Sequence, residues 1–337
     1  MRLGVNVTHR DPWIAREAER LGFEVALVPE GFRADAVSTL GHLTATTERI
    51  GISCIAQIPA RTPSMAAMTA AALHTLSGGR FTLGLGVSNA YATEVWHGSP
   101  FDRPLARTRE YLAVVRMALR GDEVRHQGEH FTVPLPGRDG EPLRMEPAGV
   151  PIHLAAVGPR NLELAGEAAD GWIAVFATPG QIEEAGPHIA AGRARAGERA
   201  GDGFDVLLTA QLAVGDDPES LAEPLRAHPA RFMSLGHREQ NFYYRRAARM
   251  GFEREAAEVQ DRYAGGDRAG AAAAVPFGFV DATSLLGPVD RIAARMKEYA
   301  AAGVTTLVLT PEAPDRAGRV AALRTAVEAL DHAGAAD

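Results

Sequence analysis

Residues 62–87 have the sequence TPSMAAMTAAALHTLSGGRFTLGLGV, and the order of helix-starting and helix-ending residues in it decides the fold. Thr62-Pro63 starts a helix, because proline is favoured in the first turn, where its missing N–H costs no hydrogen bond. The helix is expected to end at Ser77-Gly78-Gly79, since glycine can turn the chain out of a helix without a Cβ clash. Residues 81–87 then form an apolar strand. The stretch is therefore one helix–glycine–strand unit.

The same unit recurs along the chain. Asp11-Pro12 starts a helix that ends at Leu21-Gly22, and glycine also precedes strands at Gly171 and Gly303. Eight strands are predicted in this way, at residues 3–8, 23–28, 50–58, 81–87, 152–157, 172–176, 206–214 and 304–310. Such repetition indicates right-handed βαβ crossovers and a parallel sheet in the α/β class. Eight units in about 310 residues fit a (β/α)8 TIM barrel, although spacing alone leaves an open doubly wound sheet as the alternative.

Two segments interrupt the alternation. Residues 121–149 are rich in glycine and proline, and we expect an excursion with a small hairpin there. Residues 216–286 carry predicted helices, an alanine tract at 271–274 and a strand-like segment at 277–280. Both are predicted to be insertions in one domain that spans residues 1–337, rather than linkers between two domains.

Composition excludes several classes of protein. The 337 residues include 35 basic and 42 acidic side chains, which gives a net charge of −7 and argues against a nucleic-acid partner. No apolar run is long enough for a membrane helix and no signal peptide is evident, so we expect a cytoplasmic protein. The one cysteine, Cys54, excludes internal disulfides and cysteine-rich metal sites. The one lysine, Lys297, lies between Met296 and Glu298, which excludes a Walker A loop.

Three short motifs partly match patterns for zinc binding, a serine nucleophile and dinucleotide binding, but each match is incomplete. Residues 126–130, HQGEH, match a zinc-binding pattern, but the central Gly128 and the flanking strand residues favour a hairpin turn, and no metal site is predicted. Residues 86–90, GVSNA, approach a serine nucleophile elbow, but Ala90 replaces the second glycine and a loop is expected to follow. Gly84-x-Gly86 lacks the third glycine of a dinucleotide-binding fingerprint.

Polar residues follow the predicted strands where active sites of parallel barrels collect. They are Asn6, Thr8, His9, Glu30, Ser53, Gln57, Ser88, Asn89, Gly158, Arg160, Thr178, Gln211 and Thr310. The set contains no carboxylate cluster, metal triad or nucleophile–base pair. We therefore expect a cofactor to supply the difficult chemistry while the protein orients it.

Residues 79–88, GRFTLGLGVS, followed by Trp96-His97-Gly98 and residues 101–104, FDRP, resemble the bacterial-luciferase-like superfamily, and more narrowly its branch that uses coenzyme F420. Residues 151–160, PIHLAAVGPR, are a second matching block. The resemblance covers nearly the whole chain. It implies a (β/α)8 barrel, a small-molecule substrate, and a homodimer or larger even homo-oligomer.

The resemblance also implies the cofactor site. The family's non-proline cis peptide in the third strand maps onto Ser53-Cys54, behind the cofactor ring, with Ala56 nearby. Ser88 and Asn89 match the ring-side loop. The phosphate contacts match a loop whose N–H groups and guanidinium suit an anion: Val157, Gly158, Pro159 and Arg160. Arginines expected near the anionic tail are Arg33, Arg61 and Arg160.

One departure bears on the reaction. Sugar-phosphate dehydrogenases of the family carry an Asp-His pair after the second strand, whereas this chain has Glu30-Gly31. Glu30 is predicted to face the ring as a proton donor, with His9 as a second candidate. We therefore expect F420-dependent hydride transfer, with C=C or C=N reduction favoured. The alternatives are a flavin mononucleotide (FMN) monooxygenase, or a barrel without cofactor that acts as a binding protein.

Overall fold

The computed structural model describes residues 1–31, 34–138 and 143–335, and it contains all eight predicted strands. They are β1 (Arg2–Asn6), β2 (Val25–Pro29), β3 (Gly51–Gln57), β4 (Phe81–Gly86), β7 (Ile152–Ala155), β8 (Gly171–Val175), β9 (Asp205–Val214) and β11 (Thr306–Pro311). Each pairs with the next in parallel, and the pairings of β8 with β9, β9 with β11 and β11 with β1 close the sheet. The protein is thus a closed eight-stranded barrel, and the open-sheet alternative is excluded.

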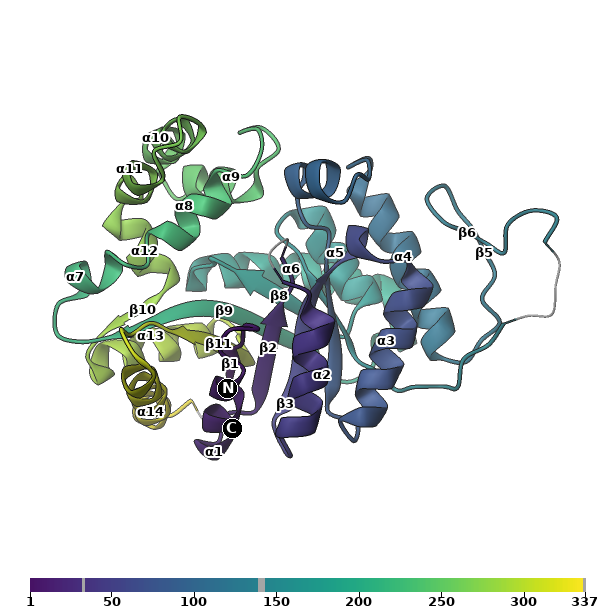
Figure 1. Ribbon diagram of the computed structural model, residues 1–337, viewed down its shortest axis with the longest axis horizontal. Helices are drawn as coiled ribbons and strands as arrows, with labels where there is room; N and C mark the ends of the chain where they lie inside the picture. The colour runs from purple at the N-terminus through teal and green to yellow at the C-terminus, as the bar shows by residue number, and fades with distance from the viewer. Residues whose placement is uncertain (32–33, 139–142, 336–337) are drawn as a thin grey trace.

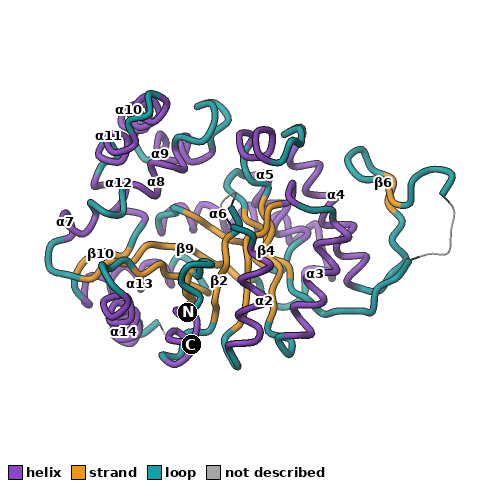
Figure 2. The backbone as a smooth tube through the Cα atoms, viewed as in Figure 1, coloured by secondary structure: helices purple, strands orange, loops and turns teal. Residues whose placement is uncertain are grey.

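Helices surround the strands (Figures 1 and 2). The barrel helices are α1 (Trp13–Arg20), α2 (Ala36–Thr46), α3 (Pro63–Leu76), α4 (Pro104–Leu119), α5 (Pro159–Ala168), α6 (Pro179–Ala196), α13 (Val289–Ala301) and α14 (Arg316–Ala333). Short turns of helix lie at η1 (Ile58–Ala60), η2 (Ala92–Trp96) and η3 (Gly197–Ala200). The π-helical turn η2 corrects the expectation of a plain loop after β4. No helix within the described ranges is long and apolar enough to cross a bilayer.

The first insertion is the predicted hairpin. Strands β5 (His126–Gln127) and β6 (Thr132–Val133) pair antiparallel and project from the barrel beyond α4 (Figure 1). The HQGEH motif forms its turn, where the N–H of Gly128 donates to the carbonyl of Phe131. Glu110 of α4 accepts hydrogen bonds from the backbone N–H groups of Glu129 and His130. The motif is therefore a turn packed on a helix.

The second insertion is helical and has a hydrophobic core of its own. Its elements are α7 (Pro218–Ala222), α8 (Ala227–Met233), α9 (Phe242–Arg249), α10 (Glu253–Ala264), α11 (Arg268–Ala273), α12 (Phe277–Thr283) and β10 (Leu285–Gly287). The strand expected at 277–280 is wrong, because Pro276 starts α12 and the buried residues Phe279, Val280 and Thr283 lie on one helical face. Phe176, Ala213 and Leu286 join this core to the barrel. Figure 1 shows α8 to α11 gathered beside one end of the barrel.

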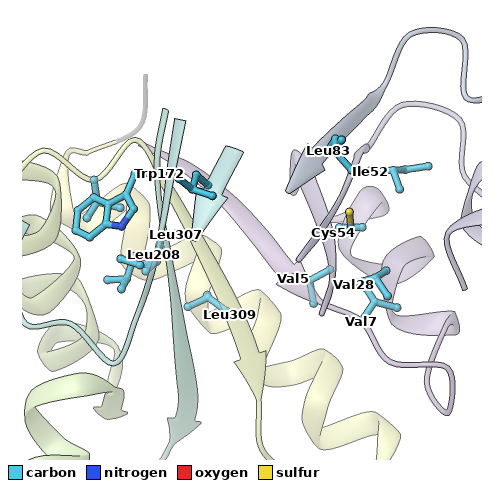
Figure 3. Close-up of a cluster of buried hydrophobic side chains, with 14 of the residues drawn as sticks. Val5, Val7, Val28, Ile52, Cys54, Leu83, Trp172, Leu208, Leu307 and Leu309 are labelled. Carbon is cyan, nitrogen blue, oxygen red and sulfur yellow. The ribbon is translucent and has the colours of Figure 1, made fainter. Parts of the chain in front are cut away.

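The main core lies between the strands and the barrel helices. Val5, Val28, Ile52, Cys54 and Leu83 belong to it, each at most 4% exposed (Figure 3). Inside the barrel a smaller layer fills the lumen: Leu27, Ile173, Leu207 and Val308, with Ile55 and Ala155 packed against them. The lumen is therefore filled with side chains, and any ligand must lie above that layer.

Candidate active site

A cavity of about 270 Å³ lies over the C-terminal ends of the barrel strands. Every barrel strand contributes a lining residue; one from each, in strand order, gives Asn6, Leu27, Ala56, Gly86, Ala155, Ile173, Gln211 and Thr310. We call it the mouth cavity. Because loops and insertions can vary at this end of a barrel without disturbing its core, this is where barrel enzymes place their active sites.

Most of the polar strand-end residues predicted to converge do so. Those that line the mouth cavity are Asn6, Glu30, Gln57, Ser88, Asn89, Gln211 and Thr310, and Ala56 and Val157 join them. Those outside its lining are Thr8, His9, Ser53, Gly158, Arg160 and Thr178. His9 is exposed in the turn after β1. The structure therefore does not bring His9 to the place where a proton donor was expected.

Ser53 and Cys54 contradict one expectation from the sequence. The peptide bond between them is not cis. Both residues continue the regular ladder of β3 with β2, in which Leu27 is opposite Ser53 and Val28 is opposite Cys54. Cys54 points into the core between strands and helices, and burial raises the pKa of its thiol to about 12 (Figure 3). Both side chains lie outside the lining of the mouth cavity.

Glu30 faces the mouth cavity, with 6% of its side chain exposed, but both oxygens of its carboxylate already accept hydrogen bonds from the protein. Arg61 donates two hydrogen bonds to its carboxylate, at 2.9 Å and 2.5 Å. The backbone N–H groups of Gln57 (2.8 Å) and Ala36 (3.4 Å) donate to the same two oxygens. The Glu30 carboxylate therefore anchors the ends of β2 and β3 and the start of α2. Arg61 is not available for an anionic tail, and Arg33 lies outside the described residues.

Two non-glycine residues in the lining have a left-handed backbone. Ser88 has φ 62° just after β4, and Phe176 has φ 51° just after β8. This conformation is costly for residues with a Cβ and often marks a functional site. It turns each chain sharply out of its strand at the cavity.

One wall of the cavity comes from the second insertion, and its residues were not identified from the sequence. His228, Arg231 and Phe232 of α8 and Phe242 and Tyr243 of α9 line it. The ring of His228 lies 5.3 Å from that of Phe176 and 5.0 Å from that of Phe232. The accessible face of His228 opens on the cavity, inside the protein envelope. Desolvation there, together with the positive charge of Arg231, lowers the pKa of its imidazole to about 4. Burial likewise raises the pKa of Tyr243.

A second cleft, of about 380 Å³, adjoins the mouth cavity and shares Val157 and Phe242 with it. The predicted phosphate loop borders it through Gly158 and Pro159, at the start of α5, whereas Arg160 is exposed and outside its lining. The arginines that line it are instead Arg245, Arg246 and Arg249 of α9. We call it the arginine cleft. Sequence reasoning missed these residues, although three arginines within five positions of one helix were a visible signal.

Comparison with known proteins agrees with this architecture. Residues 9–306 match the family model described as luciferase-like monooxygenase. A Mycobacterium tuberculosis protein whose name places it among coenzyme F420-dependent oxidoreductases is 35% identical over 91% of this chain and 92% of its own. The 5,10-methylenetetrahydromethanopterin reductase of Archaeoglobus fulgidus is 30% identical over 75% of this chain and 74% of its own.

Solved structures confirm the fold. The coenzyme F420-dependent tetrahydromethanopterin reductase of Methanopyrus kandleri superposes with a TM-score of 0.82 at 22% identity, covering 98% of this chain and 99% of the other. The family model covers most of the chain, and the first relative matches nearly end to end. The chain therefore belongs to the luciferase-like family, in the group that contains the coenzyme F420-dependent oxidoreductases.

Proposed function

We propose that this protein is an oxidoreductase that transfers a hydride between coenzyme F420 and a small organic substrate, with reduction of a C=C or C=N bond favoured. The main support for the proposal is that all eight barrel strands contribute residues to one cavity with an apolar floor. In addition, a relative with 35% identity is named as a coenzyme F420-dependent oxidoreductase. Cavities of this kind, with few polar groups on a mostly apolar wall, are typical cofactor sites.

The residues present fit a deazaflavin ring. Leu27, Ile55 and Ile173 form an apolar floor. Above it, the Oδ1 atom of Asn6 is buried and has no hydrogen-bond partner in the described part of the chain, while its Nδ2 donates to Thr310 Oγ1 at 3.1 Å. An unpaired buried acceptor is costly unless a ligand supplies a donor. The pyrimidine edge of a deazaflavin carries such an N–H.

When bound, reduced F420 supplies the hydride. The chain's own residues orient the reactants and exclude water: Ser88 and Asn89 on one side, and Phe176, Phe232 and Tyr243 on the other. Phe176 and Phe232 pack edge-to-face at 5.5 Å, and Tyr243 packs against Phe232 at 5.0 Å. An aromatic wall of this kind suits a planar or unsaturated substrate.

The protonation states of the lining support reduction over alcohol oxidation. Tyr243 lines the cavity and, like any phenol, carries its proton at neutral pH, so its hydroxyl can donate to a carbon or nitrogen that has accepted a hydride. Burial raises the pKa of this phenol further, so Tyr243 does not act as a base. A base for alcohol oxidation would need a neighbour that accepts a proton readily. Glu30 is bound by Arg61, and Gly31 has no side chain. His228 lines the cavity, but with a pKa lowered to about 4 it is a weak base. We therefore assign the proton-donor role to Tyr243 in place of Glu30 and His9.

Two measurements test the proposal. The purified protein is titrated with F420 and, separately, with FMN while tryptophan fluorescence is followed, since Trp172 lines the arginine cleft. Binding of F420 in preference to FMN is expected. Binding of FMN alone would favour an oxygen-activating monooxygenase, as the family's name suggests, and binding of neither would favour a non-enzymatic binding protein.

The second measurement addresses the reaction. With reduced F420, the protein should reduce activated alkenes or imines, and with oxidised F420 it should not oxidise glucose 6-phosphate or secondary alcohols. Gly31→His tests whether the absence of a histidine at this position sets the direction of the reaction. A side chain there fits, because a Cβ at Gly31 meets no atom within 4 Å and the residue lines the mouth cavity. Efficient alcohol oxidation by the unmodified protein would overturn the favoured direction.

A further inference from the structure

Gln57, the last residue of β3, joins the mouth cavity to a histidine outside it. Its backbone N–H donates to Glu30 Oε2 at 2.8 Å, and its side-chain Nε2 donates to the backbone carbonyl of Glu30 at 3.1 Å. The side-chain Oε1 lies 3.0 Å from Nε2 of His97. Gln57 is only 9% exposed and lines the mouth cavity, whereas His97 is half-buried and lies outside the lining.

The donors and acceptors around this amide fix its orientation. A backbone carbonyl only accepts hydrogen bonds, so the amide atom that faces the carbonyl of Glu30 is the nitrogen. The amide oxygen therefore faces His97, and since this oxygen also only accepts, Nε2 of His97 carries the hydrogen. The donors thus run in one direction, from His97 to Gln57 to Glu30.

The π-helical turn η2 brings His97 to Gln57, from which it is 40 residues away in the sequence. The left-handed backbone of Ser88 turns the chain out of β4, and the side chain of Asn89 accepts a hydrogen bond from the backbone N–H of Ala92 at 2.9 Å. The backbone N–H of His97 donates to the carbonyl of Ala92 at 3.2 Å and closes the turn. π-Helical turns are rare and frequently lie at functional sites.

One hydrogen of the Gln57 amide has no partner in the described part of the chain. The NH2 group has two hydrogens, and the carbonyl of Glu30 accepts one of them. Because Gln57 is otherwise buried, the second can reach an acceptor only in the mouth cavity. A buried donor without an acceptor is costly, so the cavity is suited to a ligand that offers an acceptor at this point.

The ring of the cofactor is not the ligand that we expect there. The proposed function gives the pyrimidine edge of the ring to Asn6 on β1, and the carbonyl groups of that edge flank its N–H. Gln57 is on β3, with β2 between, so the two residues start two strand spacings, about 10 Å, apart. The acceptor for Gln57 is therefore assigned to the second molecule in the cavity, the substrate.

We propose that the substrate carries a C=C bond conjugated to a carbonyl group, that the carbonyl oxygen accepts this N–H of Gln57, and that His97 is the positioning residue that holds the amide. The proposal rests on the proposed function and narrows its substrate class. Without His97, the amide is held at one end only, by Glu30.

The reduction balances with groups already described. The carbon β to the carbonyl accepts the hydride from reduced F420, and the conjugated electron pairs shift so that the oxygen becomes that of an enolate. The α-carbon then takes a proton, which Tyr243 can donate, so the substrate is reduced and F420 is oxidised. An N–H of Gln57 aimed at the oxygen stabilises the negative charge of the enolate.

The first experiment tests the chain of donors in the ligand-free, full-length protein. Long-range proton–nitrogen NMR spectra of the isotope-labelled protein show which ring nitrogen of a histidine carries a hydrogen, and comparison with His97→Gln assigns the signals of His97. We expect a hydrogen on Nε2. A ring protonated at Nδ1 alone would overturn the proposal, because Oε1 of Gln57 would then have no donor.

The second experiment measures the reduction of two enones, cyclohexenone and linear pentenone, and of a cyclic imine, pyrroline, with reduced F420. The variants are Gln57→Met, which removes the amide, His97→Leu, which removes the donor of the ring, and His97→Gln, which keeps an N–H donor. His42→Leu is the matched control, since His42 is an exposed histidine of α2 outside both cavity linings. F420 affinity is titrated separately by fluorescence, and urea unfolding reports stability.

At saturating F420, Gln57→Met should lower kcat/KM for the enones by about ten- to a hundredfold, the range for a hydrogen bond to a charged group. His97→Leu should lower it by about three- to tenfold, as loss of a neutral hydrogen bond does, and His97→Gln should recover most of this loss. In the Gln57→Met background, His97→Leu should lower it no further, because His97 acts through Gln57. F420 affinity should stay the same throughout, and His42→Leu should match the wild type. If Gln57→Met fails to fold, the His97 variants still decide.

Each contrary result overturns the proposal. Wild-type kcat/KM in His97→Leu, or an equal loss in His97→Gln, shows that His97 does not position the amide by donating to it. Weaker F420 binding by Gln57→Met with unchanged enone reduction assigns the acceptor to the ring. Reduction of pyrroline but of neither enone removes the carbonyl group from the substrate and leaves the proposed function standing, whereas reduction of none of the three overturns both.

Discussion

Arg61 and Glu30 form a two-point ion pair at the edge of the mouth cavity, with 14% and 6% of their side chains exposed. The pair joins the end of β2 to the residue after η1, and backbone N–H groups of Gln57 and Ala36 complete it. Its position makes Glu30 a determinant of the shape of the cavity.

The first prediction concerns this pair. Glu30→Gln leaves the Arg61 guanidinium with only the half-exposed carboxylate of Asp35, 3.7 Å away, as a counter-ion among the described residues. It should lower the free energy of unfolding by up to about 3–5 kcal/mol, the usual cost of breaking a buried ion pair. Arg61→Met should do the same for the opposite charge. The double variant should recover part of the loss, which a double-mutant cycle from urea unfolding measures. Additive losses would show that the two side chains do not interact.

A second prediction concerns Gly84. The β3–β4 ladder pairs Ser53 with Thr82 and resumes at Ala56 with Leu85. In the gap, a Cβ on Gly84 would lie 1.8 Å from the carbonyl oxygen of Cys54 and 2.9 Å from Ile173 Cδ1. Gly84→Ala should therefore destabilise the protein by about 1–3 kcal/mol or more, as overpacking does.

Gly86 on the same strand is the control for that experiment. A Cβ there would meet Ile55 Cγ2 at 3.4 Å and Ala155 Cβ at 3.6 Å, which are close to ordinary contacts. Gly86→Ala should keep a thermal midpoint near that of the wild type, while Gly84→Ala lowers it. Similar midpoints for the two variants would mean that β3 can move away from Gly84 at little cost.

The fold could be predicted from sequence because its signals are local. Proline at a helix start or glycine at a helix end marks most of the units, and all eight strands are found near their predicted positions. Closure of the barrel was not predictable in the same way, since it depends on β8 pairing with β9 and β11 pairing with β1 from the other end of the chain. At residues 277–280, apolar composition indicated a strand, but Pro276 and the packing of Phe279 make it helical.

The site was predictable only where it follows the strand ends. Asn6, Gln57 and Ser88 could be placed because parallel strands end together at one face. The alternation of side chains along β3 could also have separated Ile55, which faces the lumen, from Cys54, which faces the helices. The partner of Glu30 and the arginines of α9 depend on contacts between distant segments and on how the insertion folds. The sequence shows that three arginines lie close together at 245–249, but not where the insertion places them, nor which residue pairs with Glu30.

A third prediction concerns Asn6. Its unpaired Oδ1 should accept a hydrogen bond from the cofactor, so Asn6→Leu should weaken F420 binding by about two- to twelvefold, the usual range for one hydrogen bond. The free energy of unfolding of the ligand-free variant should change little, because the substitution removes an unsatisfied buried acceptor and, at the same time, the hydrogen bond from Nδ2 to Thr310. Fluorescence titration and urea unfolding measure the two effects separately. A variant that loses stability and keeps its affinity would assign Asn6 a structural role only.

The last prediction concerns the pH dependence of stability at His228. Desolvation beside Phe176 and Phe232, together with the positive charge of Arg231, lowers the pKa of its imidazole to about 4 in the folded protein, against 6.5 ordinarily. Between these two pH values the unfolded chain binds a proton at this position that the folded chain does not. The contribution of His228 to stability is therefore complete above pH 6.5 and declines as the pH falls toward 4.

His228→Phe keeps an aromatic ring in the wall and removes the titrating group. Its free energy of unfolding should fall less steeply than that of the wild type between pH 6.5 and about 4, as urea midpoints across this range would show. His153, whose pKa burial also lowers, is present in both proteins, so its contribution cancels in the difference. Parallel curves would mean that His228 titrates normally in the folded state, and hence that water enters the mouth cavity freely enough to solvate the imidazolium.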